Sequence, residues 1–433
     1  MNIYNYQEAF GAWDKTTQAM RKAIREWFSL YYGAEATAQA DPCQRVAYTV
    51  VNKLVKTVFA EYASKTKDPQ LKQILTSLEE QKQAAMQLAL VGGECYIKPC
   101  PGPKGISFTL IPRDNVLIFG RDAKGEPTDV GTAEQSILGN HYYTLLERRR
   151  MDAEGYLTIE NRLYRSLTGQ SLGQQVDLAT HPDYASLAGS YTFEKPVGSV
   201  GLIRMRTPML NCVDGSPEGV SVYAAAAGLI RSIDRNEAQL NGEFIRGQSR
   251  IIASRDLLDA DKNLTDDLFV GLDDDPEQVG LTIFSPALRE QSYLARKQEY
   301  LRNVETVIGL KRGLLSDTNA EERTATEIAS SQGEHNLTAM EFQGMWEKTL
   351  RDAAGLCAVL AELYCMNVPK DNAVSVDWGN GVLYDEEKRW EDYQKMVQQG
   401  LLRPEIALGW RFNLPADTEQ DLKTIREKYM PCS

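Results

Sequence analysis

The stretch SPEGVSVYAAAAGLIRSIDRNEAQLNGEFIRG, residues 216–247, decides how the rest of the chain is interpreted. Ser216 followed by Pro217 is typical of a helix start. A serine hydroxyl accepts a hydrogen bond from first-turn amides, and a proline at the first helical position loses no hydrogen bond, because an amide there has no partner within the helix. The apolar residues that follow recur mostly at three- and four-residue spacing, which predicts one apolar stripe along a helix over 216–248. They are Val220, Tyr223, Ala227, Ile230, Ile233, Leu240 and Phe244.

A second helix with the same kind of start is predicted over 285–310. It begins at Ser285 and Pro286, and its apolar face carries Leu294, Leu301, Val304 and Ile308. Residues 249–284, between the two helices, contain the β-like runs SRIIAS and VGLTIF separated by an acidic loop. We therefore expect an antiparallel helix pair with a small module at its tip. A tip on a stalk usually contacts another molecule.

Composition limits the class of protein. The chain has 433 residues, enough for two to four domains, and its 42% hydrophobic and 25% charged residues are typical of a folded protein. No run approaches the roughly 18–20 uncharged apolar residues of a membrane span, and the N-terminus carries no secretory signal pattern. Seven scattered cysteines favour a reducing, cytosolic setting. The net charge of −12 argues against a protein that wraps nucleic acid, but not against one that lets nucleic acid slide past.

The first half of the chain predicts helices followed by a sheet. Helices are expected over 11–32, 42–62 and 68–90, each with apolar residues aligned on one face. Short β-like runs separated by turn signals then predict a small mixed or antiparallel sheet, and a Gly-, Ser- and Gln-rich stretch over 167–195 predicts a loop. The fold class expected from these elements is α+β and mainly helical.

The last third predicts one long helix and a small terminal section. The helix is expected over 325–364, started by a capping box of Thr324 and Glu327. A strand and turn in AVSVDWGNG and two short helices, over 384–399 and 417–429, would end the chain. The long helix is expected to kink or break at its internal glycines, Gly333, Gly344 and Gly355.

A search for catalytic and metal-binding patterns finds none that is complete. The sequence has no phosphate-binding loop, no dinucleotide fingerprint and no nucleophile elbow. His141, His181 and His335 lie far apart without the spacing of zinc ligands. The acidic run from Asp273 to Glu277 lacks the glycine and terminal glutamate of a calcium loop. We therefore expect no enzyme activity, no metal and no cofactor.

Basic residues gather near the second predicted helix of the pair, interleaved with glutamates. The sequence favours an ordinary solvated helix face for them, and the alternative is a face toward a phosphate-bearing partner. The residues are Arg289, Arg296, Lys297, Arg302, Lys311 and Arg312.

Several stretches, taken in order, resemble the portal proteins of bacteriophages, in the group typified by phages SPP1 and A118. The resemblance covers most of the chain from about residue 45 onward, and it depends on the order of the segments rather than on one motif. The segments are GGECYIKP (92–99), RTPMLNCVDGSPEGVSVY (206–223), IDRNEAQ (233–239), RIIAS (250–254), FSPALREQSYLARKQEYLRNVETVIGL (284–310), TATE (324–327) and YDEEKRWEDYQKMVQQGLLRPEIALGWRF (384–412).

The resemblance implies a ring, usually of twelve copies, at one vertex of the phage head. Double-stranded DNA would pass through it without sequence preference during packaging and ejection. The ring would dock the terminase and later the head-completion adaptor and tail, and it would contact the major capsid and scaffolding proteins. The protein would belong to the virion after assembly in the host cytoplasm, with no membrane contact, no cofactor and no active site of its own.

The resemblance also implies a division of the chain and two sets of candidate residues. The parts would be a wing (1–215), a first stem helix (216–248), a clip (249–284), a second stem helix (285–310), a tunnel loop (311–324), a long wing helix (325–366) and a crown (367–433). Candidates for facing DNA in the tunnel are Lys311, Arg312, Arg323, Arg296 and Lys297. Candidates for docking a partner at the clip are Asp266, Asp267, Asp273, Asp274, Asp275 and Glu277.

Two other interpretations stay open. The chain could be a different structural protein of a virion head or connector, which closed rings with a DNA-wide hole would argue against. It could also be a metal-dependent DNA-processing enzyme with an unrecognised motif, which a metal-stimulated activity would reveal.

Overall fold

The computed structural model describes residues 3–33, 43–102, 105–247, 250–254, 269–272, 282–284, 288–317, 325–379, 386–412, 414, 416 and 418–430. They form two compact units, Met1–Asp377 and Trp378–Ser433, and each is described by itself. The expected mixture of helices and antiparallel sheets, mainly helical, is confirmed in these residues.

The N-terminal helices differ from the prediction at their ends. After the short elements η1 (Ile3–Tyr6) and α1 (Gln7–Phe10), helix α2 runs over Gln18–Tyr32 and starts late because the Thr17 side chain caps it. The expected start near residue 11 was wrong, and Trp13 is 73% exposed. Helix α3 covers Val46–Val58, while Asp41 and Pro42 lie outside the described residues.

The single helix expected over 68–90 is two helices, α4 (Pro69–Glu79) and α5 (Lys82–Gly92). The Asp68 carboxylate caps α4 by accepting bonds from the amides of Gln70 and Leu71. The break follows from tertiary contacts, since the Gln81 side chain donates to the carbonyl of Phe108 on a neighbouring strand.

Two antiparallel sheets follow α5. The first has the order β10–β2–β3, and the second has the order β4–β5–β6–β7–β8 with β9 paired to β7. The loop expected over 167–195 therefore contains two short strands and a 3-10 helix. The bounds are β2 (Glu94–Gly102), β3 (Gly105–Pro112), η2 (Arg113–Asn115), β4 (Val116–Arg121), β5 (Pro127–Leu138), β6 (His141–Met151), β7 (Leu157–Ser166), β8 (Gln174–Val176), η3 (Leu178–Thr180), β9 (Ser190–Thr192) and β10 (Ile203–Arg206).

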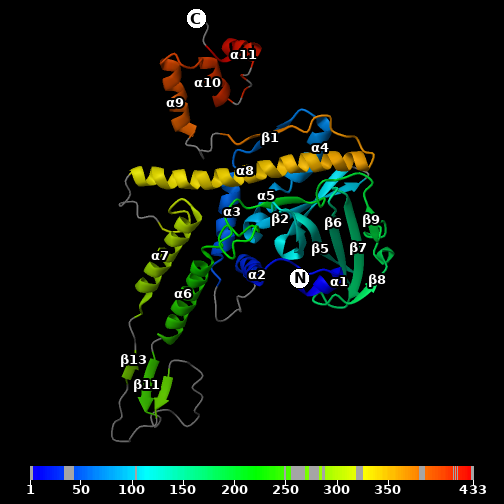
Figure 1. Cartoon of the computed structure of the whole chain (residues 1–433). Helices are drawn as coiled ribbons and strands as arrows, with labels where there is room; N and C mark the ends of the chain where they lie inside the picture. The colour runs from blue at the N-terminus through cyan, green and yellow to red at the C-terminus, as the bar shows by residue number, and fades with distance from the viewer. Residues whose placement is uncertain are drawn as a thin grey trace. The chain divides into compact units, whose positions relative to one another are not determined.

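Two helices and a small sheet come next along the chain (Figure 1). Helix α6 (Ala227–Arg246) leads to strands β11 (Arg250–Ser254), β12 (Phe269–Leu272) and β13 (Thr282–Phe284), and helix α7 (Glu290–Ile308) follows them. Strand β11 is central, parallel to β12 and antiparallel to β13. The start predicted at Ser285 and Pro286 lies outside the described residues.

Helix α8 (Ala325–Leu363) is one continuous helix, so the expected break at its glycines was wrong. A side chain at Gly344 or Gly355 would meet nothing within 4 Å, which shows that neither glycine marks a close contact. The helix contacts α3, α4, β2 and β10, and Trp346 is fully buried with its ring 5.5 Å from that of Phe59.

The first unit ends with a two-stranded antiparallel sheet of β1 (Ala63–Thr66) and β14 (Val374–Asp377). The second unit contains α9 (Glu386–Gln398), α10 (Pro404–Arg411) and α11 (Glu419–Tyr429). Helix α10 was not predicted. Within this unit Thr418 and Asp421 form a capping box that starts α11, and Leu422 and Ile425 are buried.

Candidate functional site

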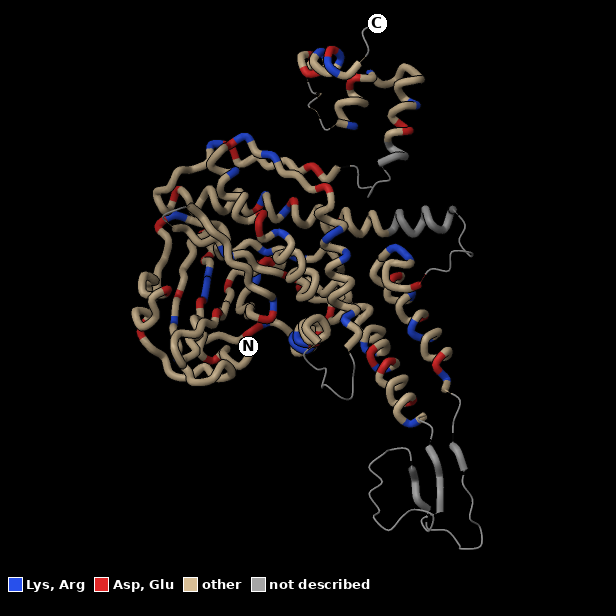
Figure 2. The backbone as a smooth tube through the Cα atoms, turned by 180° about the vertical axis from the view of Figure 1, so that it is seen from behind, with Lys and Arg blue, Asp and Glu red and all other residues tan. Residues whose placement is uncertain are grey.

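Helices α6 and α7 form an antiparallel pair held by polar contacts that join residues far apart in sequence. The Arg289 guanidinium makes two bonds to the Glu243 carboxylate, of 2.9 and 2.8 Å. Lys297 Nζ lies 2.8 Å from Glu237 Oε2, and the Asn236 side chain donates to the carbonyl of Tyr293. Acidic and basic residues accordingly interleave along both helices (Figure 2). The expected antiparallel pairing of the two helices is confirmed.

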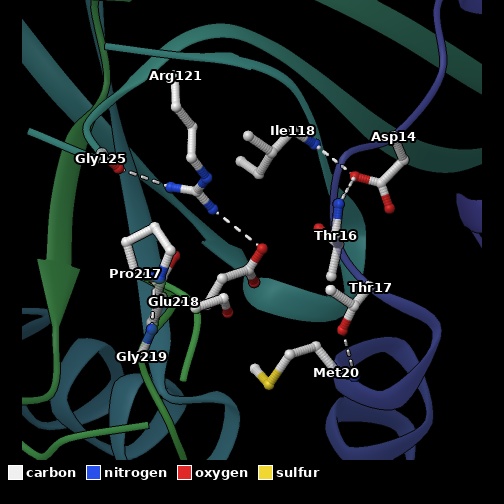
Figure 3. A network of polar contacts seen from close by, with 12 residues as sticks. Asp14, Thr16, Thr17, Met20, Ile118, Arg121, Gly125, Pro217, Glu218 and Gly219 are labelled. Atoms are coloured by element: carbon white, nitrogen blue, oxygen red, sulfur yellow. Dashed lines mark hydrogen bonds and ion pairs between the residues drawn. The ribbon is translucent and has the colours of Figure 1, made fainter. Parts of the chain in front are cut away.

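The root of α6 is fixed to the sheets by a buried network of charged groups (Figure 3). The Glu218 carboxylate accepts bonds from Arg113, at 2.5 Å, and from Arg121, at 3.0 Å. Arg113 is 1% exposed and also donates to the carbonyl of Val116 and to the Thr16 hydroxyl. Segments that precede α2, follow β3 and precede α6 therefore meet at one buried point.

Glu94, the first residue of β2, is the second carboxylate of this network and is fully buried. It accepts bonds from Arg204 at 2.5 Å, from the amide of Gly219 at 2.7 Å and from the Tyr96 hydroxyl at 2.8 Å. Burial by itself would raise the pKa of Glu94, but Arg204 and Arg113 reverse this and hold the pKa well below its usual 4.5. Glu94 is therefore ionised at neutral pH and binds the backbone ahead of α6.

Two glycines allow this backbone to approach the sheet. A side chain at Gly219 would place its Cβ 2.2 Å from the carbonyl oxygen of Gly93, and one at Gly93 would lie 2.4 Å from the Gly219 carbonyl. Gly93 also has a φ of +80°, a conformation that favours glycine. Thr207 joins the two segments, since its amide donates to the carbonyl oxygen of Gly93 and its hydroxyl donates to that of Val220.

This anchor corrects the predicted start of the first helix. Ser216 does not cap a helix, since its hydroxyl accepts a bond from Asn211 and α6 begins at Ala227. Pro217 packs on the turn at Gly125 and uses its carbonyl to bind Arg204. The local sequence suggested a helix cap because the same residue types also occur in loops that bind distant groups. Only the contacts with Arg113 and Glu94 show that this segment is such a loop.

The start of α3 connects to both helices of the pair. The amide of Gln44 donates to Asp234 of α6 at 2.7 Å, and the Gln44 side chain accepts a bond from Lys297 of α7 at 2.8 Å. Lys297, predicted as a DNA-facing residue, thus points between helices and binds Glu237 and Gln44. The structure does not bring it together with Arg296, whose guanidinium instead bonds the Tyr300 hydroxyl.

The segment that leaves α7 is held by one buried carboxylate. Glu305 is 1% exposed and accepts bonds from the amides of Gly313, Leu315 and Ser316 and from the Ser316 hydroxyl, over 2.5–3.1 Å. Lys53 of α3 binds the carbonyl of Leu314. Residues 311–317, the first half of the predicted tunnel loop, are therefore folded against α7 and α3.

We expect Glu305→Gln to loosen this segment, with a loss of about 1–3 kcal/mol in local stability, since an amide offers one acceptor to several donors. Hydrogen exchange of the amides of Gly313, Leu315 and Ser316 measures it, with Glu299→Gln on the exposed face of α7 as control. Unchanged protection of these amides in Glu305→Gln would contradict the assigned role.

His335 of α8 is 7% exposed, and its Nδ1 has no hydrogen-bond partner among the residues described. Burial lowers the pKa of His335 below its ordinary 6.5, and the charge of Lys311 lowers it further. The folded protein therefore resists protonation of this ring, whereas the unfolded chain takes up the proton as the pH falls through 6.5.

The contribution of a neutral His335 to the free energy of unfolding should be fully present above about pH 7. It should decrease as the pH falls below 6.5, by at most about 1.4 kcal/mol per pH unit for one proton. Denaturation of the wild type and of His335→Gln at pH 7.5 and 5.5 tests this. The variant should show the smaller loss on acidification, and equal losses would show that His335 does not titrate on unfolding.

A hollow of about 330 Å³ lies on one flank of the helix pair. It is lined mainly by arginine, tyrosine and amide or hydroxyl side chains, including Arg235, Asn236, Arg289, Tyr293, Arg296 and Tyr300. The Arg296 guanidinium lies 5.0 Å from the centre of the Tyr300 ring. Sequence reasoning selected Arg296 but missed Arg235, because the helix pairing that brings them together is not visible in either helix.

The structure describes only some of the remaining predicted site residues. Lys311 and Arg312 lie at the start of the segment that Glu305 holds, and Arg312 is exposed. Arg323 lies outside the described residues. So do all six acidic residues of the predicted docking set, Asp266, Asp267, Asp273, Asp274, Asp275 and Glu277. These assignments stay predictions.

One arrangement of serine, histidine and acid occurs elsewhere in the first unit. Ser136 Oγ lies 3.3 Å from His181 Nε2, and His181 Nδ1 lies 3.9 Å from the Asp183 carboxylate. The amide of Asp183 donates to Nδ1 at 3.3 Å, so a neutral ring carries its proton on Nε2 and cannot accept the serine proton there. The arrangement is therefore unsuited to nucleophilic catalysis.

Within the described ranges, no group of three or more histidine, cysteine, aspartate or glutamate residues is placed to hold a metal ion. Likewise, none of the helices in that part of the chain is long and apolar enough to cross a membrane.

Comparison with known proteins gives no family. No protein-family model and no curated protein matches the sequence. Among solved structures, a chain from the neck of a native GTA particle computed with C12 symmetry is similar at 13% identity and a TM-score of 0.44. A chain from the neck of an empty GTA particle computed with C6 symmetry is similar at 12% identity and a TM-score of 0.46. Each similarity covers 95% of this chain and 98% of the other. Since both TM-scores are below 0.5, neither similarity defines the fold or function of this chain.

Proposed function

We propose that this chain is a structural protein of a phage-like virion head or neck, and specifically a portal protein that forms a ring around passing double-stranded DNA. The observation that carries the proposal is the anchored helix pair α6–α7. Along the chain, α6 follows the sheets of the first unit, strands β11–β13 follow α6, and α7 is followed by the long helix α8. This is the order of elements that the sequence resemblance implies.

The proposal assigns a role to each part. The body with its sheets and α8 forms the wing, α6 and α7 form the stem, β11–β13 belong to the clip, and the C-terminal unit forms the crown. Strand β14 pairs with β1, so the described units divide at residue 377 rather than at 367. In this proposal the buried network of Glu94, Arg113 and Glu218 joins the root of the stem to the wing.

Partners follow from the same proposal. The clip, with its acidic residues, would dock the terminase and then the head-completion adaptor, and the wing would contact the major capsid and scaffolding proteins. The exposed Arg312 and its neighbour Lys311 stay candidates for touching DNA. In the proposed mechanism the protein itself hydrolyses nothing, and a separate motor moves the DNA.

Electron microscopy of the purified full-length chain tests the proposal. We expect closed rings, of about twelve copies, with a central hole wide enough for a DNA duplex. Closed rings without such a hole would favour another head or connector protein. A chain that stays monomeric at all concentrations, or that cuts DNA when a divalent metal is added, would contradict the proposal.

A further inference from the structure

A groove of about 600 Å³ lies within the first unit, between helix α8 and the sheets. One wall is the face of α8 from Lys348 to Val359. The other wall is the turn between β4 and β5, residues 122–128, together with the segment 197–204. We call this space the α8 groove. The proposed function gives it no role.

The two walls of the α8 groove carry complementary charges. The helix presents two cations and one carboxylate, and the turn presents two carboxylates and one cation. They are Lys348, Arg351 and Asp352 on α8, and Asp122, Glu126 and Lys124 on the turn. In the part of the chain that the structure describes, no ion pair joins these two sets. Arg351 binds Glu347 of its own helix at 2.8 Å, and Glu126 binds Arg204 of its own wall at 3.1 Å.

A like charge faces Asp352 across the groove. Burial raises the pKa of Asp352, the charge of Lys348 lowers it, and the charge of Glu126 raises it. Lys348 lies one helical turn from Asp352 and is exposed. The walls therefore stand with two carboxylates facing each other, while the cation that would stabilise Glu126 lies one turn away.

The α8 groove also has room to become narrower. Gly355 lies on its helical wall, and a Cβ there would meet nothing within 4 Å. Leu356 and Val359 of the same wall are half-buried, as is Met151 on the side of the sheet. Bringing the walls together would remove more of this apolar surface from water, which is favourable.

The turn that forms the second wall is tied to the anchor of α6. Arg121 joins the carbonyl of Gly125, in this turn, to the Glu218 carboxylate (Figure 3). Arg204 binds both Glu126 and the carbonyl of Pro217. A movement of the turn toward α8 therefore reaches the backbone that leads into α6.

We infer that the α8 groove closes by an ion pair between Lys348 and Glu126, and that this closure couples the long helix α8 to the anchor of α6. The structure holds the open form. Complementary charges and apolar surface favour closure, and repulsion between Asp352 and Glu126 opposes it. The balance depends on single exposed charges, so closure responds to salt. The device lies within one copy of the chain and does not depend on the proposed ring.

The test is the rate of disulfide formation in full-length protein that carries Ser199→Cys and Gly355→Cys, one on each wall. A disulfide needs the two Cα atoms within about 7 Å, so its rate reports closure. We expect the bond to form under mild oxidation, identified by peptide mass spectrometry. At low ionic strength, adding Lys348→Glu should slow it about threefold and adding Asp352→Asn should speed it about threefold.

Three controls make the assay specific. Lys72→Glu, on an exposed face of α4 outside the groove, should leave the rate unchanged. Each cysteine alone should react with a monofunctional thiol reagent at the same rate in all variants, which excludes changed thiol reactivity. In 1 M salt, where the screening length is about 3 Å, the charge effects should disappear. Circular dichroism should show every variant folded.

Hydrogen exchange of the Gly219 amide, in chains without the added cysteines, tests the coupling. We expect faster exchange in Lys348→Glu and slower exchange in Asp352→Asn, because closure steadies the segment that Glu94 and Arg204 hold. If no disulfide forms, or if its rate ignores both charge changes, the groove does not close in this way. If the disulfide rates change while exchange at Gly219 does not, the coupling to α6 is wrong.

Discussion

Replacing Glu94 by glutamine is expected to lower the free energy of unfolding by about 3–5 kcal/mol, the cost of leaving a buried charge without its partner. Glu94 is fully buried between Arg204 and Arg113 and accepts three hydrogen bonds. Glutamine has the same shape but no charge, and its amide group would direct N–H donors at groups that are themselves donors. The two guanidinium groups would then lose much of their compensation in a site that water does not reach.

Equilibrium denaturation with urea, followed by circular dichroism, measures this loss. The matched control is Glu126→Gln, because Glu126 binds the same Arg204 at 3.1 Å but its side chain is 51% exposed. An exposed pair of this kind contributes less than about 1 kcal/mol. Equal effects of the two substitutions would show that burial does not decide the strength of the anchor.

The low pKa of Glu94 also predicts how the free energy of unfolding changes in acid. Its pKa is depressed in the folded state, so its contribution to stability is complete above the ordinary value of 4.5 and is lost as the pH falls toward the folded pKa. Glu94→Gln should remove part of this acid sensitivity, which distinguishes lost charge from lost packing.

Replacing Gly219 by alanine is expected to cost about 3 kcal/mol or more, because overpacking here is against backbone rather than against a flexible side chain. The added methyl carbon would lie 2.2 Å from the carbonyl oxygen of Gly93 and 2.8 Å from Cγ of Glu94. Relief requires the segment ahead of α6 to move away from β2. The bond from the Gly219 amide to Glu94 would then lengthen or break.

The same denaturation experiment measures this cost, with Gly355→Ala as control. Gly355 lies inside α8, and a side chain there meets nothing within 4 Å. Alanine at that position should stabilise the helix by up to about 1 kcal/mol. If Gly219→Ala is as well tolerated as Gly355→Ala, the close approach of the two backbones is not essential for folding.

The Gly219 variant also has a consequence for the proposed ring. The helix pair leaves the body at this anchor, so a displaced root would tilt α6 and α7 against neighbouring copies. We expect reduced or irregular ring assembly at temperatures where the variant is still folded. The Glu94 and Gly219 effects should be far from additive, since both changes act on one contact.

Much of the secondary structure could be predicted from local pattern. Apolar spacing identified α6, α7 and most of α8, because a helix that buries one face repeats its apolar residues at 3.6-residue intervals. Alternating runs between turn residues identified the sheet region for the corresponding reason. The prediction failed where long-range contacts override local preference, as at Gln81, whose bond to Phe108 accompanies the division of one expected helix into two.

The sequence predicted only part of the candidate site. Arg296 and Lys297 are neighbours in sequence and were grouped together, yet one lines an exposed hollow and the other binds Glu237 and Gln44. Adjacent helix positions point about 100° apart, so their roles depend on which face the partner helix covers. Arg235 and Glu305 carried no signal, because the other residues of the hollow around Arg235 lie largely on another helix and the amides that bind Glu305 lie beyond the end of its helix.

From the amino-acid order alone come the mainly helical α+β class, the helix pair, the long helix and the resemblance on which the proposed function rests. These depend on periodicity and on short ordered motifs, which are local properties of the chain. The tertiary structure was needed to show that residues 216–219 anchor a helix rather than start it. That distinction depends on Arg113, Glu94 and Gly93, which lie more than a hundred residues away in sequence. Folding removes water from the charges of Arg113 and Glu94 and brings Gly93 into contact with Gly219.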